Sequence, residues 1–254
     1  MSIRIGIDIG STATKVAIFN GDVLEKTFSV PTGWSSVETS EKIKKDLENE
    51  GYDFSKCKVT ATGYGRISVP YAQKTLTEIT CHSKGVQYLS GKDEFTVIDV
   101  GGQDTKVIEI VDGAVENFIM NDKCSAGTGR FIEVMANILG VKLDTLYDLA
   151  TKGKNTEISS MCTVFAESEV ISLMGKGTAK EDIANGVIAS VVNKVAGLAS
   201  RGKTANLYFL SGGLCASPYF IEELSKKLKS QVISHPLGRY AGAIGAALMQ
   251  KRER

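Results

Sequence analysis

Short apolar runs open the chain and predict strands. Residues 3–7 (IRIGI) and 96–98 (TVI) are each followed by a glycine-containing turn and then by a second apolar run. The second runs meet Asn20-Gly21 and Asp112-Gly113, residue pairs that strongly favour a two-residue hairpin turn. The chain therefore contains, twice, a strand, a glycine turn and a hairpin.

Helical spacing follows. Ser36 is the expected N-cap of a helix that Gly51 ends, and strands are expected at 58–62 and 206–210. Further helices are expected over 218–229 and 242–250, the latter rich in small residues. Apolar residues spaced by three, four and seven predict three more helices, at Ile132, Met135, Ala136 and Leu139; at Ala166, Val170, Leu173 and Met174; and at Ile183, Val187, Val191, Val195 and Leu198.

Alternating strands and helices predict α/β architecture, and the duplicated hairpins predict two related lobes. The first lobe is expected to comprise 1–93 with 237–254, and the second 94–236. Only four prolines occur and no low-complexity linker is visible, so the lobes are expected to touch across a cleft.

Composition narrows the class of protein. Hydrophobic residues make up 43% and charged residues 23%, as in ordinary soluble proteins, and a net charge of +1 argues against nucleic-acid binding. No apolar run reaches membrane-spanning length, and the N-terminus lacks signal-peptide character. Five cysteines, an odd number, suit a reducing cytoplasm better than a disulfide framework.

The two glycine turns share one motif. Residues 8–15 (DIGSTATK) and 99–106 (DVGGQDTK) each carry Asp, then Gly at +2, Thr at +6 and Lys at +7. Glycine lets backbone N–H groups approach phosphate, hydroxyls such as those of Ser11 and Thr12 add donors, and a carboxylate at a strand end suits Mg²⁺. Either copy alone also fits an ordinary strand–turn–strand unit. Together they predict two facing loops that hold one nucleoside triphosphate.

Two cysteines raise a second possibility. Cys124 in 121–131 (NDKCSAGTGRF) and Cys162 in 159–170 (SSMCTVFAESEV) each come just before a predicted helix. The positive end of a helix favours a thiolate and would stabilise an anionic iron–sulfur cluster. Two cysteines are half of the usual four ligands, and a symmetric dimer would supply the rest. A free cysteine is also a common packing residue, so the residues alone leave metal ligation open.

The motifs together resemble a known family. They are DIGSTATK, GYGR, DVGGQDTK, NDKCSAGTGRF, SSMCTVFAESEV, SGG and GAIGAAL, from Ile3 to about Leu248. They resemble the ATP-dependent activators of 2-hydroxyacyl-CoA dehydratases, a family that includes the ATPase subunits of benzoyl-CoA reductase. The resemblance implies the acetate and sugar kinase, Hsp70 and actin fold. It also implies a homodimer that shares one [4Fe–4S] cluster and uses ATP to pass a low-potential electron to a partner metalloenzyme, with a ferredoxin or flavodoxin as donor.

The resemblance also assigns roles to residues. It implies that Cys124 and Cys162 hold the cluster and that 8–15 and 99–106 are the phosphate loops. From their place at strand ends, Asp8 and Asp99 are expected to hold Mg²⁺ through water. Gln103 would orient the attacking water or donate to phosphate, and Asp8 or Asp104 would serve as base or hold a metal-bound water. The expected nucleotide contacts are Gly10, Ser11, Thr12, Ala13, Thr14, Lys15, Gly101, Gly102, Gln103, Asp104, Gly127, Thr128, Gly129, Arg130, Phe131, Gly212, Gly213, Leu214 and Arg239. Residues 214–218 (LCASP) depart from the family's pattern, which leaves the adenine contacts open.

Two rival functions share the fold. A small-molecule kinase would need a base beside an acceptor hydroxyl and a sugar pocket, and no polar cluster of the sequence suits them. An actin-like filament or regulatory module would need no iron. The partner enzyme could be a 2-hydroxyacyl-CoA dehydratase, a benzoyl-CoA-type reductase or a related reductase with an unusual cluster. The remaining cysteines (Cys57, Cys81, Cys215) and both histidines (His82, His235) are expected to be packing or surface residues.

Overall fold

The structure, a computed structural model, describes residues 3–154, 156–159 and 162–250. The chain divides into two compact units. Unit 1 comprises the residues up to Glu94, the segment Ile110–Glu116 and the residues from His235 onward. Unit 2 comprises Phe95–Glu109 and Asn117–Ser234.

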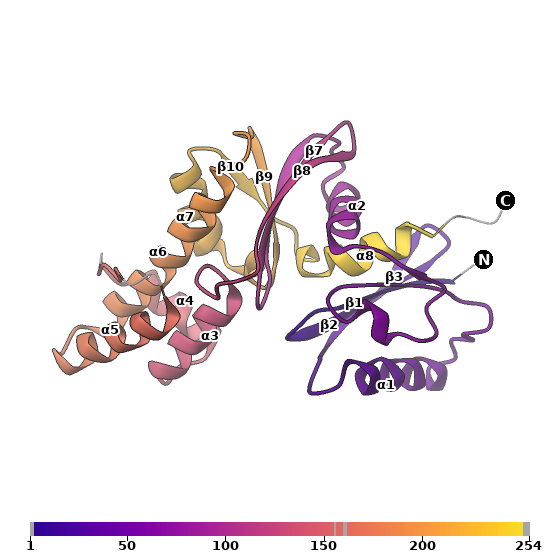
Figure 1. The fold of residues 1–254 in the computed structure, drawn as a ribbon, viewed down its shortest axis with the longest axis horizontal. Coiled ribbons are helices and arrows are strands. Elements are labelled where there is room, and N and C mark those ends of the chain that lie inside the picture. Colours follow the sequence, from indigo (N-terminus) through magenta and orange to yellow (C-terminus); the bar gives the residue numbers. More distant parts are fainter. Residues whose placement is uncertain (1–2, 155, 160–161, 251–254) are drawn as a thin grey trace. The chain divides into compact units, whose positions relative to one another are not determined.

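Unit 1 is built on a five-stranded mixed sheet in the order β3-β2-β1-β4-β5. Its strands are β1 (Ile3–Ile9), β2 (Ala13–Asn20), β3 (Val23–Pro31), β4 (Lys58–Thr62) and β5 (Lys74–Thr75). Its helices are α1 (Ser36–Asn49), α2 (Glu78–Ser90) and α8 (Ala241–Leu248), with short 3₁₀ turns η1 (Arg66–Ser68) and η3 (Gly238–Tyr240). Helix α1 covers one face of β1 and β2, and α2 with α8 covers the other (Figure 1).

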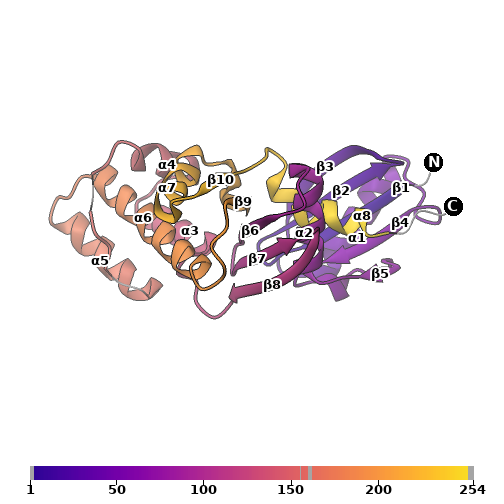
Figure 2. The ribbon, with the colours of Figure 1, turned by 90° about the horizontal axis from the view of Figure 1, so that it is seen from above.

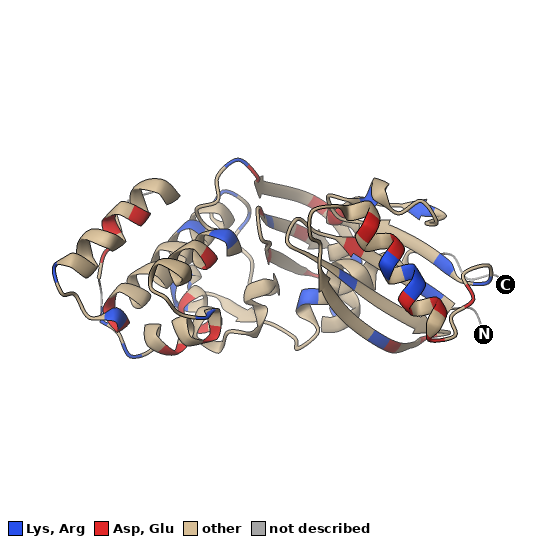
Figure 3. Ribbon diagram, turned by 90° about the horizontal axis from the view of Figure 1, so that it is seen from below, with Lys and Arg blue, Asp and Glu red and all other residues tan. Residues whose placement is uncertain are grey.

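Helix α1 starts one residue earlier than the pattern indicates. Ser35, not Ser36, is the N-cap, because its side chain accepts a hydrogen bond from the Glu38 N–H at 3.2 Å. Ile43 and Leu47 face the sheet. Charges of both signs mark the outer face (Figure 3), with Lys42–Asp46 and Lys44–Glu48 pairs at helical spacing, which supports an exposed helix.

Helix α8 packs so closely that only glycine fits at its contacts. A Cβ on Gly6 of β1 would lie 1.9 Å from the Ala243 carbonyl oxygen, and one on Gly85 of α2 would lie 1.9 Å from the Ala241 oxygen. A Cβ on Gly245 would lie 1.8 Å from the Cys81 oxygen. The small residues of α8 therefore let its backbone meet a strand and a helix at once, as expected from the sequence.

Replacing Gly245 with alanine should destabilise unit 1 by about 3 kcal/mol or more, since backbone rather than a flexible side chain blocks the new methyl group. The urea midpoint measures the loss. Gly175→Ala is the matched control, because nothing lies within 4 Å of a Cβ at the last residue of its helix. A Gly245→Ala protein as stable as the control would contradict this packing.

Unit 2 repeats the plan with a second sheet, in the order β10-β9-β6-β7-β8, which belongs to unit 2 except for residues 110–116. The strands of this sheet are β6 (Phe95–Val100), β7 (Thr105–Val111), β8 (Ala114–Asn121), β9 (Leu207–Gly212) and β10 (Gln231–Ile233). Its helices are α3 (Gly129–Ile138), α4 (Leu143–Ala150), α5 (Thr163–Gly175), α6 (Lys180–Ala199) and α7 (Pro218–Leu228), with the 3₁₀ turn η2 (Gly213–Ala216). Figure 2 shows β6, β7 and β8 side by side. The three helices predicted from apolar spacing are present as α3, α5 and α6.

Both predicted hairpins form, but the first turn lies one residue later than predicted. Asn20 pairs with Val23, so the two turn residues are Gly21, with φ of +59°, and Asp22. The second turn is Asp112-Gly113 as predicted, with φ of +50° and +73°. The strands before the glycine turns run longer than the apolar runs, so Asp8 and Asp99 are strand residues rather than turn residues. No helix in the described part of the chain is long and apolar enough to cross a bilayer.

Candidate functional site

The two repeated motifs fold alike. Asp8 on β1 pairs in register with Lys15 on β2, and Lys15 Nζ lies 3.8 Å from Asp8 Oδ2. In the second copy, Lys106 Nζ lies 3.7 Å from Asp99 Oδ2. The sequence repeat is therefore also a repeat in three dimensions, with an Asp–Lys ion pair at the end of a strand.

The turns between these strands match as well. The Gly10 N–H donates to the Ala13 carbonyl at 3.2 Å, and the Gly101 N–H donates to the Asp104 carbonyl at 2.9 Å. Each glycine thus closes the turn with the residue three positions on. A Cβ on Gly101 would lie 2.5 Å from Asp104 Oδ1, so this turn requires glycine.

The second copy carries extra charge and hydrogen bonding. Lys106 Nζ also lies 2.6 Å from Asp104 Oδ2, so this buried ammonium faces two carboxylates. Asp99 accepts a hydrogen bond from Ser211 Oγ at 2.8 Å. Ser211 directly precedes Gly212, whose φ of +84° and closeness to the Val100 carbonyl leave no room for a side chain. The SGG segment is therefore part of the Asp99 site.

Glycines surround Asp8 in unit 1. A Cβ on Gly63 would lie 2.6 Å from Asp8 Oδ1, and one on Gly242 would lie 2.7 Å from Asp8 Oδ2. A Cβ on Gly242 would also lie 2.9 Å from His82 Nε2. The His82 ring therefore lies near the Asp8 carboxylate. The first glycine of the GYGR motif is thus part of the Asp8 site.

The second loop is bonded to the start of α3. The Gly129 N–H donates to the Gly101 carbonyl at 2.8 Å, and the Arg130 N–H donates to the Gly102 carbonyl at 2.9 Å. Thr105 Oγ1 donates to the Gly127 carbonyl at 2.7 Å. Carbonyls of the loop therefore satisfy N–H groups that a helix start leaves without intrahelical partners.

Both candidate cluster ligands are exposed free thiols. Cys162 is the N-cap residue of α5, as expected. Cys124 is set further back, because α3 begins only at Gly129 and a turn that ends at its N-cap Thr128 intervenes. The Thr128 N–H and Oγ1 both bond the Ser125 carbonyl, at 3.0 and 2.7 Å.

A hydroxyl pair joins the two cysteine segments. Ser125 Oγ and Thr163 Oγ1 lie 2.7 Å apart, and each residue directly follows one of the cysteines. Two exposed thiols on joined segments fit half of the ligand set of an iron–sulfur cluster. Within the described ranges, no three His, Cys, Asp or Glu side chains gather into a complete metal site. Ser160 and Met161, part of the Cys162 motif, lie outside the described residues.

Some expected contact residues are buried in packing. Phe131 is 1% exposed and Leu214 is 4% exposed, and both belong to the core of unit 2. Their side chains pack beneath α3 and η2 and are not accessible to a nucleotide. Thr14 Oγ1 is likewise buried against Thr32 Oγ1, 3.0 Å away. Exposed members of the expected set are Ser11, Thr12, Gln103, Arg130, Gly213 and Arg239.

The other three cysteines are inaccessible, and burial raises the pKa of the Cys57 thiol and raises that of Cys81 to about 12. Cluster-free protein at pH 8 should therefore be alkylated by iodoacetamide at Cys124 and Cys162 well before Cys57, Cys81 or Cys215, because alkylation needs an exposed thiolate. Peptide mass spectrometry over time measures the order. Early labelling of Cys81 in folded protein would contradict the burial.

Two sheets of equivalent plan, each with an Asp–Gly–Lys loop, define the acetate and sugar kinase, Hsp70 and actin fold. Overall similarity to a glucokinase from Streptomyces griseus, solved with glucose and AMPPNP, supports the fold: the TM-score is 0.63 at 15% identity, over 97% of this chain and 98% of that one. The chain belongs to the BadF/BadG/BcrA/BcrD ATPase family, whose model matches residues 5–250.

Close relatives come from within this family. The (R)-2-hydroxyglutaryl-CoA dehydratase activating ATPase of Acidaminococcus fermentans is 45% identical over 255 residues, 98% of this chain and 97% of the relative. The crystal structure of component A of that organism's (R)-2-hydroxyglutaryl-CoA dehydratase has a TM-score of 0.91 at 42% identity, over 98% of this chain and 97% of that one.

Two further relatives bear on ligand and partner. The activator of the 2-hydroxyisocaproyl-CoA dehydratase from Clostridium difficile, solved with bound ADPNP, has a TM-score of 0.89 at 36% identity, over 97% of this chain and 93% of that one. A benzoyl-CoA reductase subunit of Thauera aromatica is 30% identical over 270 residues, 98% of this chain and 93% of the relative.

Proposed function

We propose that this ATPase is an activator that, as a homodimer, delivers a low-potential electron to a 2-hydroxyacyl-CoA dehydratase. The observation that carries the proposal is the Ser125–Thr163 hydroxyl pair, which joins two exposed cysteine segments on the unit that also holds the second phosphate loop. A sugar kinase has no use for such a pair of thiols. The 45% identity to a dehydratase-activating ATPase supports the same reading.

ATP with Mg²⁺ would be held by the two matching loops. Asp8 and Asp99 would hold Mg²⁺ through water, while Lys15 and Lys106 orient these carboxylates. Gln103, exposed on the second loop, would orient the attacking water or donate to phosphate. Asp104 lies closer to its lysine (2.6 Å from Lys106 Nζ) than Asp8 does to Lys15 (3.8 Å), which favours Asp8 over Asp104 as base. The backbone contacts would come from residues 10–15, 101–103, 127–130 and 212–213, with Arg239 near the base.

Cys124 and Cys162 would hold a [4Fe–4S] cluster together with the same two cysteines of a second copy. Such a cluster would supply a one-electron donor of low potential. The protein's part is to present the thiolates: Cys162 at the positive end of α5, and Cys124 on the turn that precedes α3. The lack of a third ligand nearby in the described residues is what a cluster shared by two chains requires.

The chain offers a direct connection between nucleotide and cysteines. Carbonyls of Gly101 and Gly102 bond the first N–H groups of α3, and the turn before α3 carries Ser125. Ser125 in turn bonds Thr163 at the start of α5. A loop position that differs between ATP and ADP would thus reach both cysteine segments through five hydrogen bonds and no long side chain. Each nucleotide shifts this equilibrium only by its differential affinity for the two states.

Anaerobic reconstitution with iron and sulfide tests the proposal. The purified dimer should take up roughly four iron and four sulfide, turn brown, hydrolyse ATP and, once reduced by ferredoxin or flavodoxin, activate a purified 2-hydroxyacyl-CoA dehydratase. A colourless protein that phosphorylates sugars would support the kinase instead. The protein could instead activate a benzoyl-CoA-type reductase or a related reductase with an unusual cluster. That result would identify the reductase, not the dehydratase, as the partner enzyme. The chemistry requires a cytoplasmic supply of ATP and reductant.

The hydroxyl pair should matter for coupling more than for assembly. Ser125→Ala should leave the iron content unchanged but make iron loss to a chelator about fivefold faster and nearly the same with ATP as with ADP, because one hydrogen bond of about 1 kcal/mol is gone. Thr163→Ser, which retains the hydroxyl, is the matched control. A Ser125→Ala protein that keeps its full nucleotide dependence would rule out this connection.

A further inference from the structure

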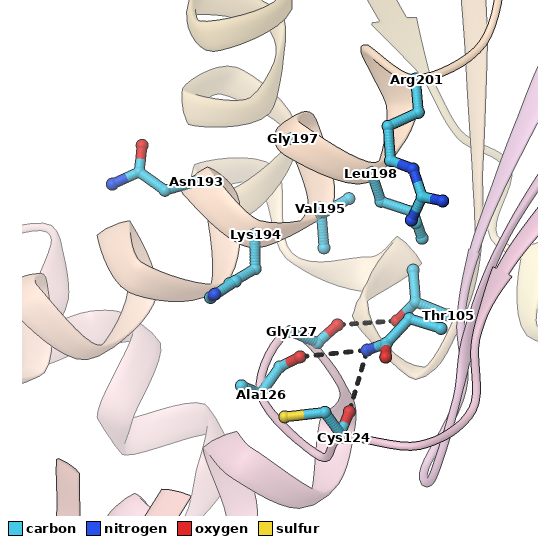
Figure 4. A pocket seen from close by; sticks show the side chains of 11 residues that line it. Thr105, Cys124, Ala126, Gly127, Asn193, Lys194, Val195, Gly197, Leu198 and Arg201 are labelled. Carbon is cyan, nitrogen blue, oxygen red and sulfur yellow. Dashed lines mark hydrogen bonds between the residues drawn. The ribbon is translucent and has the colours of Figure 1, made fainter. Parts of the chain in front are cut away.

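Unit 2 contains a pocket with two cationic side chains that none of the roles above uses. Its volume is about 480 Å³, and it lies between the C-terminal half of α6, the start of β7 and the turn that carries Cys124. Figure 4 shows the Lys194 side chain on the side of Ala126 and Cys124, and the Arg201 side chain on the side of Thr105. The size suits a small organic molecule.

The pocket has a cation near each end and no acidic side chain in its lining. Lys194 is in the last turns of α6, and Arg201 follows two residues after the helix ends. A separation of seven residues puts both side chains on the same side of the helix axis, with Cα atoms roughly 10 Å apart. In the described part of the chain, neither forms an ion pair within 4.0 Å. Glu157 lines an adjoining pocket, which Lys194 also lines, but Glu157 and Lys194 form no ion pair within 4.0 Å.

The space between the two cations is apolar. Leu198 and Val195 of α6 line it on one side, and Ala126 lines it on the other. Gly127, with φ of +86°, brings the turn so close that a Cβ there would lie 2.9 Å from the Lys194 Cβ. The turn therefore packs against the base of the lysine side chain.

We propose that this pocket binds a small organic dianion with an anionic group at each end and an apolar middle. Lys194 would bind one end and Arg201 the other, and Leu198 would contact the chain between them. Two charge-assisted contacts in a half-enclosed site favour such a ligand over one with a single charge. Cys124 also lines the pocket, so the ligand would lie beside the turn that carries this thiol.

The proposal does not depend on the cluster or on a dehydratase partner. It needs only the side chains of unit 2, and it concerns a surface other than the glycine turns of the two phosphate loops. Saturating ADP in the assay would fill the nucleotide site and remove competition from it.

Isothermal titration of the full-length, ADP-saturated protein with α,ω-dicarboxylates from succinate to pimelate tests the proposal. Affinity should pass through a maximum at one chain length, and hexanoate and inorganic phosphate should bind at least about tenfold more weakly. Lys194→Gln and Arg201→Gln should each weaken the best dicarboxylate by about tenfold. Lys180→Gln, at the start of α6 and outside the lining, should change nothing.

Lys194→Arg, which keeps the charge, should restore most of the binding that Lys194→Gln loses. Thermal midpoints and ATPase rates equal to wild type would show that the variants are folded. Binding of phosphate or hexanoate as tight as that of the best dicarboxylate would overturn the two-ended ligand. Binding of no dicarboxylate, for instance because the partner copy fills the pocket, would overturn the site.

Discussion

Alanine at Cys124 or Cys162 is expected to give a folded ATPase that holds no iron–sulfur cluster. Both thiols are exposed and outside the cores, so their loss should change the free energy of unfolding by less than about 0.5 kcal/mol. In a dimer that shares one cluster, each substitution removes two of four ligands, because both copies carry it. Iron and sulfide content after anaerobic reconstitution measures the effect, together with visible absorption.

Cys57→Ala is the informative control for this result. Cys57 is 5% exposed and packs in the core of unit 1, so its loss should lower stability but leave the cluster complete. Full iron content in Cys124→Ala, or its loss in Cys57→Ala, would show that the cluster ligands are wrongly assigned. Folded protein in all three cases is verified by far-ultraviolet circular dichroism.

Asparagine at Asp99 should lower ATP hydrolysis on the order of a hundredfold or more. The side chain keeps its size and can still bond Ser211, but it loses the charge that faces Lys106 and would hold Mg²⁺. Phosphoryl transfer depends on positioning and charge neutralisation, so the chemical step should suffer more than the fold. Turnover measured against Mg²⁺ concentration at saturating ATP, with the thermal midpoint as a check, quantifies the loss.

The matching substitution Asp8→Asn should act in the same direction, since Asp8 has the same Asp–Lys geometry in unit 1. Asp144→Asn is the control, because that carboxylate is exposed in the first turn of α4, away from both loops. Wild-type turnover in Asp99→Asn would mean that the loop is an ordinary strand turn, as either copy alone could be.

Local signals predict most of the fold. The two hairpin turns depend on a few adjacent residues, although the first lies at Gly21-Asp22, one residue beyond the predicted pair. The helices through Ile132 and Ile183 depend on a spacing that the sequence displays directly. Helix α2 is not predicted, because its hydrophobic pattern is weak and its buried glycine matters only against α8. Its stability comes from tertiary packing.

The sequence predicts the motifs of the site but not the contacts between them. Repeat spacing places Asp8 and Asp99 in equivalent positions, yet nothing in the local sequence puts Gly63, Gly242 and His82 beside Asp8. The Ser125–Thr163 contact is similarly long-range, and both residues look like ordinary helix-start residues. Phe131 shows the opposite error: it sits in a functional motif, but its side chain belongs to the core.

The fit of α8 against β1 and α2 has a consequence for biosynthesis. Unit 1 needs residues 241–248 to cover Ala17 and Phe19, whereas every residue of unit 2 has emerged from the ribosome before then. Unit 2 can therefore complete its fold first, while the earlier-synthesised strands of unit 1 wait with an apolar face open to water. Chains that end at residue 240 and are released from the ribosome should bind chaperones, and the full-length chain should not.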